Sequence, residues 1–207
     1  MEQLEIETGE LVEINLGERR IMVDGASKIL AVLESGEIPP DEVVVNSDLF
    51  QISQASITRL CTGRWLNDEC INAYIALINQ RERETNPHQV KSFAVNTFFL
   101  PMLEDMRHTG TYNFNKLHRI IKKKKVSLRK VKNFLIPINI KHSHWLLLNC
   151  HIPTSTFYLI DSLGSRDCEP YVDLISQFLE DYFKETMGDG PPIPEESLKR
   201  WRATSPK

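Results

Sequence analysis

His144 and Asp161 are the two residues of this 207-residue chain whose types and spacing could do chemistry together. His144 begins an apolar run over residues 144–150, and Asp161 directly follows a second run over residues 156–160. Two consecutive strands joined by a short loop form a hairpin by default. We therefore expect the imidazole and the carboxylate to be neighbours at one end of a hairpin.

The loop of this hairpin determines which residues face each other. If Cys150 pairs with Thr156, residue 144 faces residue 162, one step from Asp161. A carboxylate beside an imidazole holds the ring in one tautomer and stabilises its protonated form, which is how a catalytic base is positioned. A polar pair with a purely structural role is the alternative that spacing alone leaves open.

Four cysteines, at positions 61, 70, 150 and 168, are the candidate nucleophiles for such a base. Cys150 lies along the strand from His144 at roughly 20 Å, which is too far for proton transfer. Cys70 and Cys168 lie near predicted helix starts, which lower a thiol pKa, but acidic neighbours flank both and raise it again. Cys61 is most simply a core residue.

The helix before this hairpin has the clearest sequence pattern. Asn67 is a favourable N-cap, and Asp68 suits the positive end of the helix dipole. An apolar stripe follows at helical spacing: Ile71, Tyr74, Ile75 and Ile78. Three more helices are predicted over residues 97–106, 112–121 and 169–185.

The strands of the main domain are predicted over residues 134–140, 145–149 and 156–160. Pro137 indicates a sheet edge or a bulge, because proline has no N–H for a ladder. The apolar run 145–149 favours burial on both faces. Segregated helices and consecutive strands are typical of the α+β class.

Charge divides the chain into two parts. Residues 1–42 hold 11 acidic and 3 basic residues, a net of −8, and residues 43–207 hold 17 and 22, a net of +5. We predict an acidic N-terminal extension over 1–42, with strands at 4–6 and 12–16 and a helix at 27–35, followed by the main domain over 43–207. No CxxC pair and no membrane-spanning apolar run occur, which favours the cytoplasm or the nucleus.

Four short motifs occur in order along the main domain. They are Trp65-Leu66-Asn67-Asp68, Phe93 to Phe99, Pro137 to Trp145, and Leu159-Ile160-Asp161-Ser162-Leu163. Together they resemble the ubiquitin-like-protein proteases, the SUMO (sentrin)-specific cysteine peptidases, over residues 44–207. The resemblance implies a papain-like cysteine peptidase fold in which His144 is the general base and Asp161 orients it.

The resemblance also implies which residues contact substrate. Trp65 and Trp145 match the aromatic walls of a tunnel for the modifier's Gly-Gly tail, since only glycine lets a backbone pass so close to rings. Asp68 matches an acidic position that pairs with a basic residue of the modifier. The expected partners are SUMO or another ubiquitin-like protein and its conjugates. No metal or cofactor is expected, and neither a membrane nor nucleic acid is the expected partner.

The family's nucleophile is absent from its expected place. It lies in a Gln…Asp-Cys-Gly motif after the catalytic Asp, but Asp161 is followed by Cys168 and then Gln177, in the reverse order. We therefore expect a domain truncated before that motif and inactive as it stands. The alternative is a catalytically dead module that binds a ubiquitin-like protein.

The stretch 116–132 holds nine Lys and Arg residues and no acidic residue. A solvated helix end and loop is the favoured interpretation. A nuclear-import signal or a patch for an acidic partner, including nucleic acid, are the alternatives. The densest part has no aromatic residue, which weakens the case for single-stranded nucleic acid.

Overall fold

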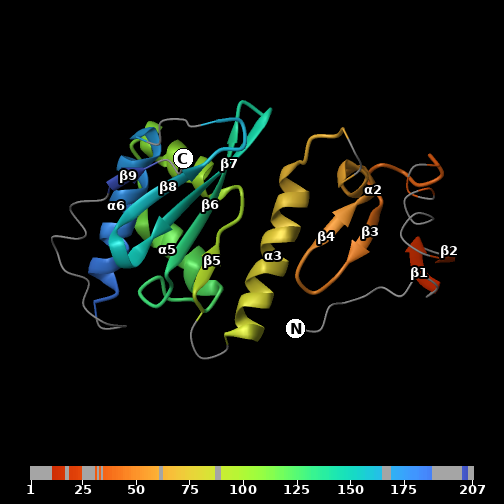
Figure 1. Ribbon diagram of the computed structural model, residues 1–207, viewed down its shortest axis with the longest axis horizontal. Coiled ribbons are helices and arrows are strands. Elements are labelled where there is room, and N and C mark those ends of the chain that lie inside the picture. Colours follow the sequence, from red (N-terminus) through yellow and green to blue (C-terminus); the bar gives the residue numbers. More distant parts are fainter. Residues whose placement is uncertain are drawn as a thin grey trace. The chain divides into compact units, whose positions relative to one another are not determined.

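The chain forms two compact units, residues 1–76 and 77–207, and helix α3 begins in the first and ends in the second (Figure 1). The computed structural model describes residues 11–16, 19–24, 31, 33, 35–60, 63–86, 90–164, 169–187 and 202–204. In that part of the chain, no helix is both long enough and apolar enough to cross a membrane. The predicted division at residue 42 stays a prediction.

The first unit contains two small antiparallel hairpins. Strands β1 (Leu11–Leu16) and β2 (Arg19–Asp24) form one, and β3 (Val43–Asn46) and β4 (Gln51–Ser53) form the other. Helix α2 (Gln54–Ile57), the 3-10 turn η1 (Thr58–Leu60) and α3 (Asp68–Thr85) follow. The strand predicted over 12–16 is confirmed. The strand at 4–6 and most of the helix at 27–35 lie outside the described residues.

Polar contacts hold the start of α3 in the first unit. The Asn67 carboxamide accepts a hydrogen bond from the Cys70 N–H at 3.1 Å, which confirms the predicted N-cap. Its amide group donates to the Ser56 hydroxyl at 2.8 Å. Burial raises the pKa of Glu69, but hydrogen bonds from Ser56 and Ser53 outweigh it, and the pKa lies below its usual value.

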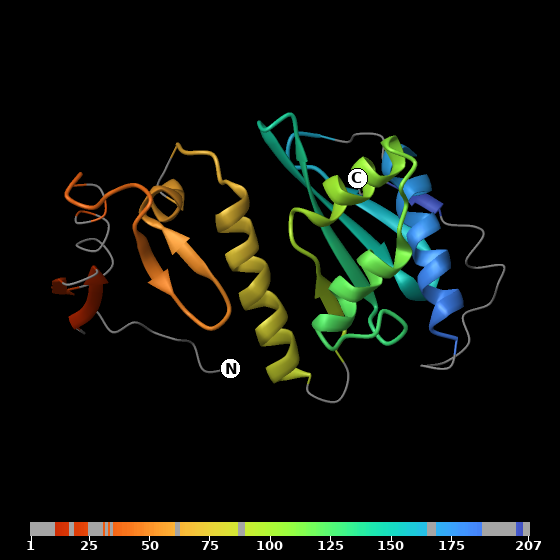
Figure 2. The same ribbon diagram turned by 180° about the vertical axis from the view of Figure 1, so that it is seen from behind.

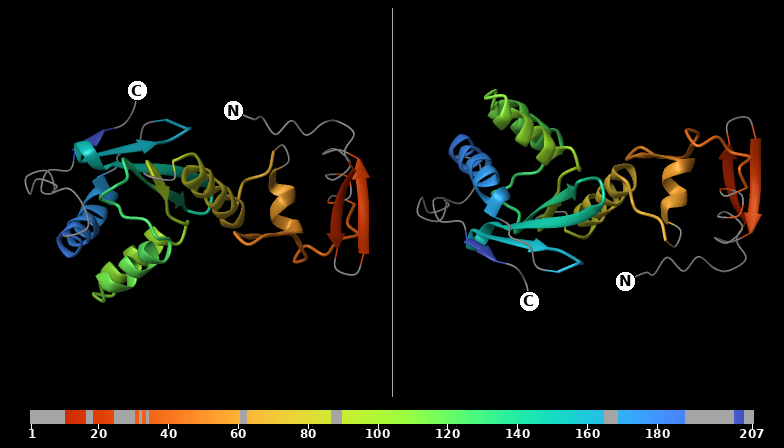
Figure 3. Two further views of the ribbon diagram at one scale, coloured as in Figure 1. Left: turned by 90° about the horizontal axis from the view of Figure 1, so that it is seen from below. Right: turned by 90° about the horizontal axis from the view of Figure 1, so that it is seen from above.

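The second unit is a five-stranded sheet with helices on one face (Figures 2 and 3). Its strand order is β5 (Ser92–Ala94), β6 (Asn133–Ile140), β7 (His144–His151), β8 (Thr156–Ile160), β9 (Arg202–Thr204). The two outer pairs are parallel, and the two inner pairs are antiparallel. Helices α4 (Phe99–His108), α5 (Phe114–Lys123) and α6 (Glu169–Glu185) cover that face. The predicted α+β class is confirmed.

Aromatic side chains form the centre of the core between the sheet and the helices. Phe178 on α6 meets Phe99 on α4 edge to face, with 5.2 Å between ring centroids, and Phe99 meets Phe134 on β6 at 5.9 Å. All three are fully buried. Helix α6 confirms the predicted element over 169–185, whereas α4 and α5 begin two residues later than predicted, α5 because Asn113 caps it.

The predicted register of the β7–β8 hairpin is wrong by one residue. His151, and not Cys150, pairs with Thr156. The connection contains the 3-10 turn η2 (Ile152–Thr154) and then Ser155 in the left-handed conformation (φ 48°), which returns the chain within four residues. Since a one-residue slip exchanges the two faces of a strand, the difference decides which side chains share a face.

Burial along β7 alternates between fully and partly buried residues. Leu146, Leu148 and Cys150 point into the core, while Leu147 and Asn149 on the other face are only half-buried. The prediction that this strand is buried on both faces is therefore wrong, and one face packs on the helices.

The edge predicted from Pro137 is confirmed by the extent of β5. Strand β5 pairs only with residues 133–135 of β6. The Val95 N–H donates to the Leu135 carbonyl at 3.0 Å, so Pro137, two residues further along, has its nitrogen on that same side. Proline thus stands where β6 has no described neighbour on that side, and its missing N–H costs no hydrogen bond to β7.

A strained turn joins β6 to β7 directly before His144. Lys141 (φ 49°) and His142 (φ 57°) both have positive φ, and the Ser143 N–H donates to the Ile140 carbonyl at 3.0 Å. Turns of this kind favour Asn-Gly, because side chains beyond Asn and Gly disfavour the left-handed region. The chain therefore holds two unfavourable residues beside the start of β7.

Replacing Lys141-His142 with Asn-Gly should raise the free energy of unfolding by about 1 kcal/mol, because the strain is removed. Urea unfolding followed by circular dichroism measures the change. The control replaces both residues with Gln, which removes the lysine charge and the imidazole but keeps the Cβ atoms. An equal gain in the control would show that electrostatics, and not backbone strain, limits stability there.

Candidate active site

His144 and Asp161 form a buried pair at the end of the β7–β8 hairpin. His144 Nε2 lies 2.6 Å from Asp161 Oδ1, and the two side chains are 8% and 2% exposed. The same Oδ1 accepts the Leu163 N–H at 2.9 Å. His144 is the first residue of β7, and Asp161 directly follows β8. Two rigid strand ends thus hold the pair.

The contact determines which nitrogen of His144 can act as a base. An ionised carboxylate only accepts hydrogen bonds, so Nε2 carries the proton that it shares with Asp161. In the neutral ring Nδ1 then holds the lone pair and can take a proton from a thiol. A buried carboxylate also stabilises the imidazolium that results.

The corrected register explains why the two side chains meet. Leu147 pairs with Ile160, so the register, if continued, sets Asp161 opposite Leu146 and diagonal to His144. Residues at this diagonal share one face of a sheet and lie within reach of each other. The prediction that His144 and Asp161 are neighbours is therefore correct. The register from which it was made is wrong, however, because that register would place the two side chains on opposite faces of the sheet.

The Leu163 N–H is a functional group that the sequence prediction missed. It belongs to the turn Asp161-Ser162-Leu163-Gly164, in which Asp161 accepts from the N–H two residues on. Asp followed shortly by Gly is a signal for such an Asx turn and could have identified it. The turn therefore helps to hold the carboxylate in the position where it contacts the imidazole.

Cys150 is excluded as the partner of this base. It lies on the same strand as His144 but six residues away, which corresponds to roughly 20 Å. Its side chain is completely buried, and burial raises the pKa of its thiol well above the usual value. Both observations agree with the expectation from spacing.

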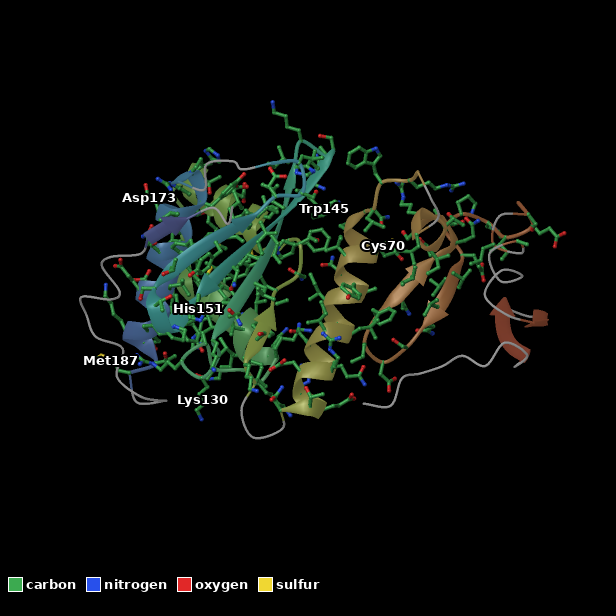
Figure 4. All side chains as sticks on the ribbon, viewed as in Figure 1. Cys70, Lys130, Trp145, His151, Asp173 and Met187 are labelled. Carbon is green, nitrogen blue, oxygen red and sulfur yellow. The ribbon has the colours of Figure 1, made fainter. Side chains whose placement is uncertain are left out.

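Cys70 is a poorly activated thiol in the first turn of α3. Burial raises its pKa, and the Glu69 carboxylate raises it further. The thiol donates to the Ser56 carbonyl at 3.0 Å. Figure 4 shows Cys70 near one end of the helix. Cys61 and Cys168 lie outside the described residues.

The expected substrate-contact residues belong to different units. Trp65 is 63% exposed just before α3, and Asp68 is the exposed first residue of that helix. Trp145 follows His144 on β7 and is half-buried (Figure 4). Their roles remain predictions, whereas His144 and Asp161 are brought into direct contact.

Comparison with solved structures supports the same fold. The Ulp1-like SUMO protease catalytic domain of Chaetomium thermophilum superposes with a TM-score of 0.60 at 18% identity, covering 90% of this chain and 72% of that one. The Ulp1 protease domain solved in complex with Smt3, the yeast ortholog of SUMO, gives 0.58 at 20% identity, covering 86% and 72%. The chain has the fold of the Ulp1 catalytic domain.

Sequence comparison identifies the family. Ubiquitin-like-specific protease 1A of Arabidopsis thaliana is 31% identical over 142 residues, 68% of this chain and 26% of that protein. Sentrin-specific protease 2 of Mus musculus is 31% identical over 152 residues, 72% and 23%. The chain thus spans about a quarter of the length of these relatives. Residues 64–204 match the C-terminal catalytic domain of the Ulp1 protease family, and the chain belongs to that family.

Proposed function

We propose that the chain carries the base and the orienting acid of a cysteine peptidase that cuts after the Gly-Gly tail of SUMO or a related modifier. The observation that supports this most directly is the buried 2.6 Å contact between His144 and Asp161, inside the segment that matches the family. The relatives are named as sentrin-specific and ubiquitin-like-specific proteases, and one structural neighbour was solved with Smt3.

The proposed chemistry assigns one step to each group. Asp161 accepts the Nε2–H and holds the ring, and Nδ1 of His144 takes the proton of a thiol. The thiolate attacks the carbonyl of the modifier's last glycine, and His144 returns the proton to the leaving amine. Water then releases the modifier from the acyl-enzyme, with His144 again acting as base.

The 207-residue chain is proposed to be catalytically silent by itself. It contains no Asp-Cys-Gly sequence. Of the described cysteines, Cys150 lies too far along β7, and Cys70 is held protonated by burial and by Glu69. A base without a reactive thiol can polarise a substrate group but forms no acyl-enzyme.

A binding module for a ubiquitin-like protein is the second candidate. Trp65 exposes 63% of its surface and precedes Asp68, which is also exposed, by three positions in the chain. A large aromatic side chain left in water next to a charge is the composition of a recognition hot spot, and it needs no nucleophile. This function and the peptidase half-site are compatible in one chain.

A fluorogenic amide at the C-terminus of SUMO should not be hydrolysed by the chain, since neither described cysteine, Cys70 or Cys150, has an activated thiol. A modifier carrying a thiol-reactive group at its C-terminus, read by mass spectrometry, tests the same point. Labelling of Cys70 or Cys168, or turnover that disappears on Cys70→Ser or Cys168→Ser, would contradict the proposal. Cys150→Ser should change neither result.

Neutral His144 should be the Nε2–H tautomer, because Nε2 donates to Asp161. Nitrogen–proton correlation spectra of the imidazole rings report this directly. Asp161→Ala should remove the preference and populate both tautomers. His151, whose Nδ1 contacts Thr154 Oγ1 at 2.7 Å, is an internal reference that should not change. An unchanged His144 tautomer in Asp161→Ala would exclude Asp161 as its orienting group.

Titration with SUMO, followed by heteronuclear NMR, should detect binding to the chain. Asp68→Ala and Trp145→Ala should each weaken it by about tenfold, the effect expected for a hot-spot contact. Asp48→Ala, an exposed acidic residue of the same unit as Asp68, is the matched control and should have no effect. Absence of binding at millimolar modifier would reject both candidate functions.

A further inference from the structure

The segment from α5 to β6 presents a basic surface that the proposed peptidase does not use. Of the nine cations in residues 116–132, only Arg129 is buried, where it stacks on the Phe183 ring at 5.4 Å and donates to Thr186 Oγ1. The other eight are exposed. With Lys91 they define the basic surface: Lys91, Lys116, Arg119, Lys122, Lys123, Lys124, Lys125, Lys130 and Lys132.

Local structure holds these cations in place. Leu117 and Ile121 are fully buried, so helix α5 turns its remaining face, with Lys116, Arg119 and Lys123, toward solvent. The chain then returns to the sheet, and the Lys132 N–H donates to the Lys91 carbonyl at 2.7 Å. Figure 4 shows Lys130 pointing outward from the edge of the second unit.

The charges of the basic surface are not neutralised from within. None of the nine forms an ion pair in the described part of the chain. Asp181, an acidic residue on the helix next to α5, accepts the Tyr112 hydroxyl at 2.8 Å. The cations therefore remain available to an external anion.

A contribution to helix stability explains the presence of only some of these lysines. Lys122 and Lys123 lie in the last turn of α5, where cations offset the helix dipole. Lys125 is different, because it follows the C-cap with φ 54°, a position where glycine is strongly preferred. Helix stability therefore explains Lys122 and Lys123 but gives no reason for a lysine at position 125.

The composition of the surface selects one class of anion. Its large apolar side chains are covered, and none of residues 114–132 is among the exposed hydrophobic residues, so it lacks the anchors of a membrane-binding face. Phe114 is packed against Phe178, so no free ring is offered for stacking on single-stranded bases. Eight of the nine cations are lysines, which bind phosphates as point charges and lack the planar, bidentate geometry by which arginine reads a specific partner.

We propose that this basic surface binds double-stranded nucleic acid through its phosphate backbone, without reading sequence. The exposed helix face and the adjoining turn place several lysines along one stretch of surface. Each lysine that neutralises a phosphate releases a counterion, so the binding must weaken steeply as salt rises. This inference is independent of the peptidase proposal and of any nucleophile.

Fluorescence anisotropy with a labelled 24-base-pair DNA duplex tests the proposal on the full chain. At 50 mM KCl we expect saturable binding, and log K should fall linearly with log salt, with a slope of about −0.9 for every phosphate neutralised. Lys124→Gln with Lys125→Gln should weaken binding at least tenfold and flatten the slope. Lys141→Gln with Lys184→Gln, exposed lysines elsewhere, removes the same net charge and should have little effect.

The Lys125→Gly variant separates the effect of the lysine charge on binding from any effect on the stability of the fold. Glycine suits the positive φ, so this variant should keep or raise the melting temperature while it weakens DNA binding by about threefold. Equal weakening by the two double variants, no binding at 50 mM KCl, or tighter binding to single strands than to the duplex would each overturn the proposal. Binding to phosphatidylserine vesicles without binding to DNA would assign the surface to a membrane instead.

Discussion

The two-residue period of strand β7 is the constraint on which the candidate site depends. The apolar side chains on one face of β7 must enter the core together, because they would otherwise be exposed to water. They are Leu146, Leu148 and Cys150. The same period then assigns His144 to the core-facing side at the strand's end, where its imidazole is almost fully buried. A buried imidazole needs a partner, and Asp161 at the end of β8 supplies it. Packing of apolar residues thus sets the position of the base.

Much of this arrangement could be predicted from sequence, because it depends on short-range patterns. Apolar runs identified β7 and β8, and Asn67 identified the start of α3. The register was not predictable in the same way. The register depends on the connection between β7 and β8, in which Ser155 has a left-handed backbone conformation. Serine gives no strong sequence signal for that conformation. The Leu163 N–H was missed because a backbone donor is indicated only indirectly, here by Asp161 and Gly164 in the turn around it.

Long-range features were hardest to infer from the chain. The apolar content of residues 145–149 indicated two buried faces, but the number of helices on a sheet depends on the whole fold. Exposure of each basic residue could not be predicted from the sequence either, since Arg129 is buried whereas the other eight basic residues of 116–132 are exposed. Likewise, burial of Cys70 depends on Ser56 in another element, which spacing from the helix start does not reveal.

Pro137 has a consequence for the solubility of the sheet. Beyond residue 135, β6 has no described strand on its outer side, and a strand edge without a partner is a template for pairing with another molecule. A proline nitrogen on that side cannot donate to an incoming strand, so a regular intermolecular ladder of hydrogen bonds would be interrupted at Pro137. Pro137 is also buried, so packing within the chain and the missing N–H together make this edge a poor template for self-association.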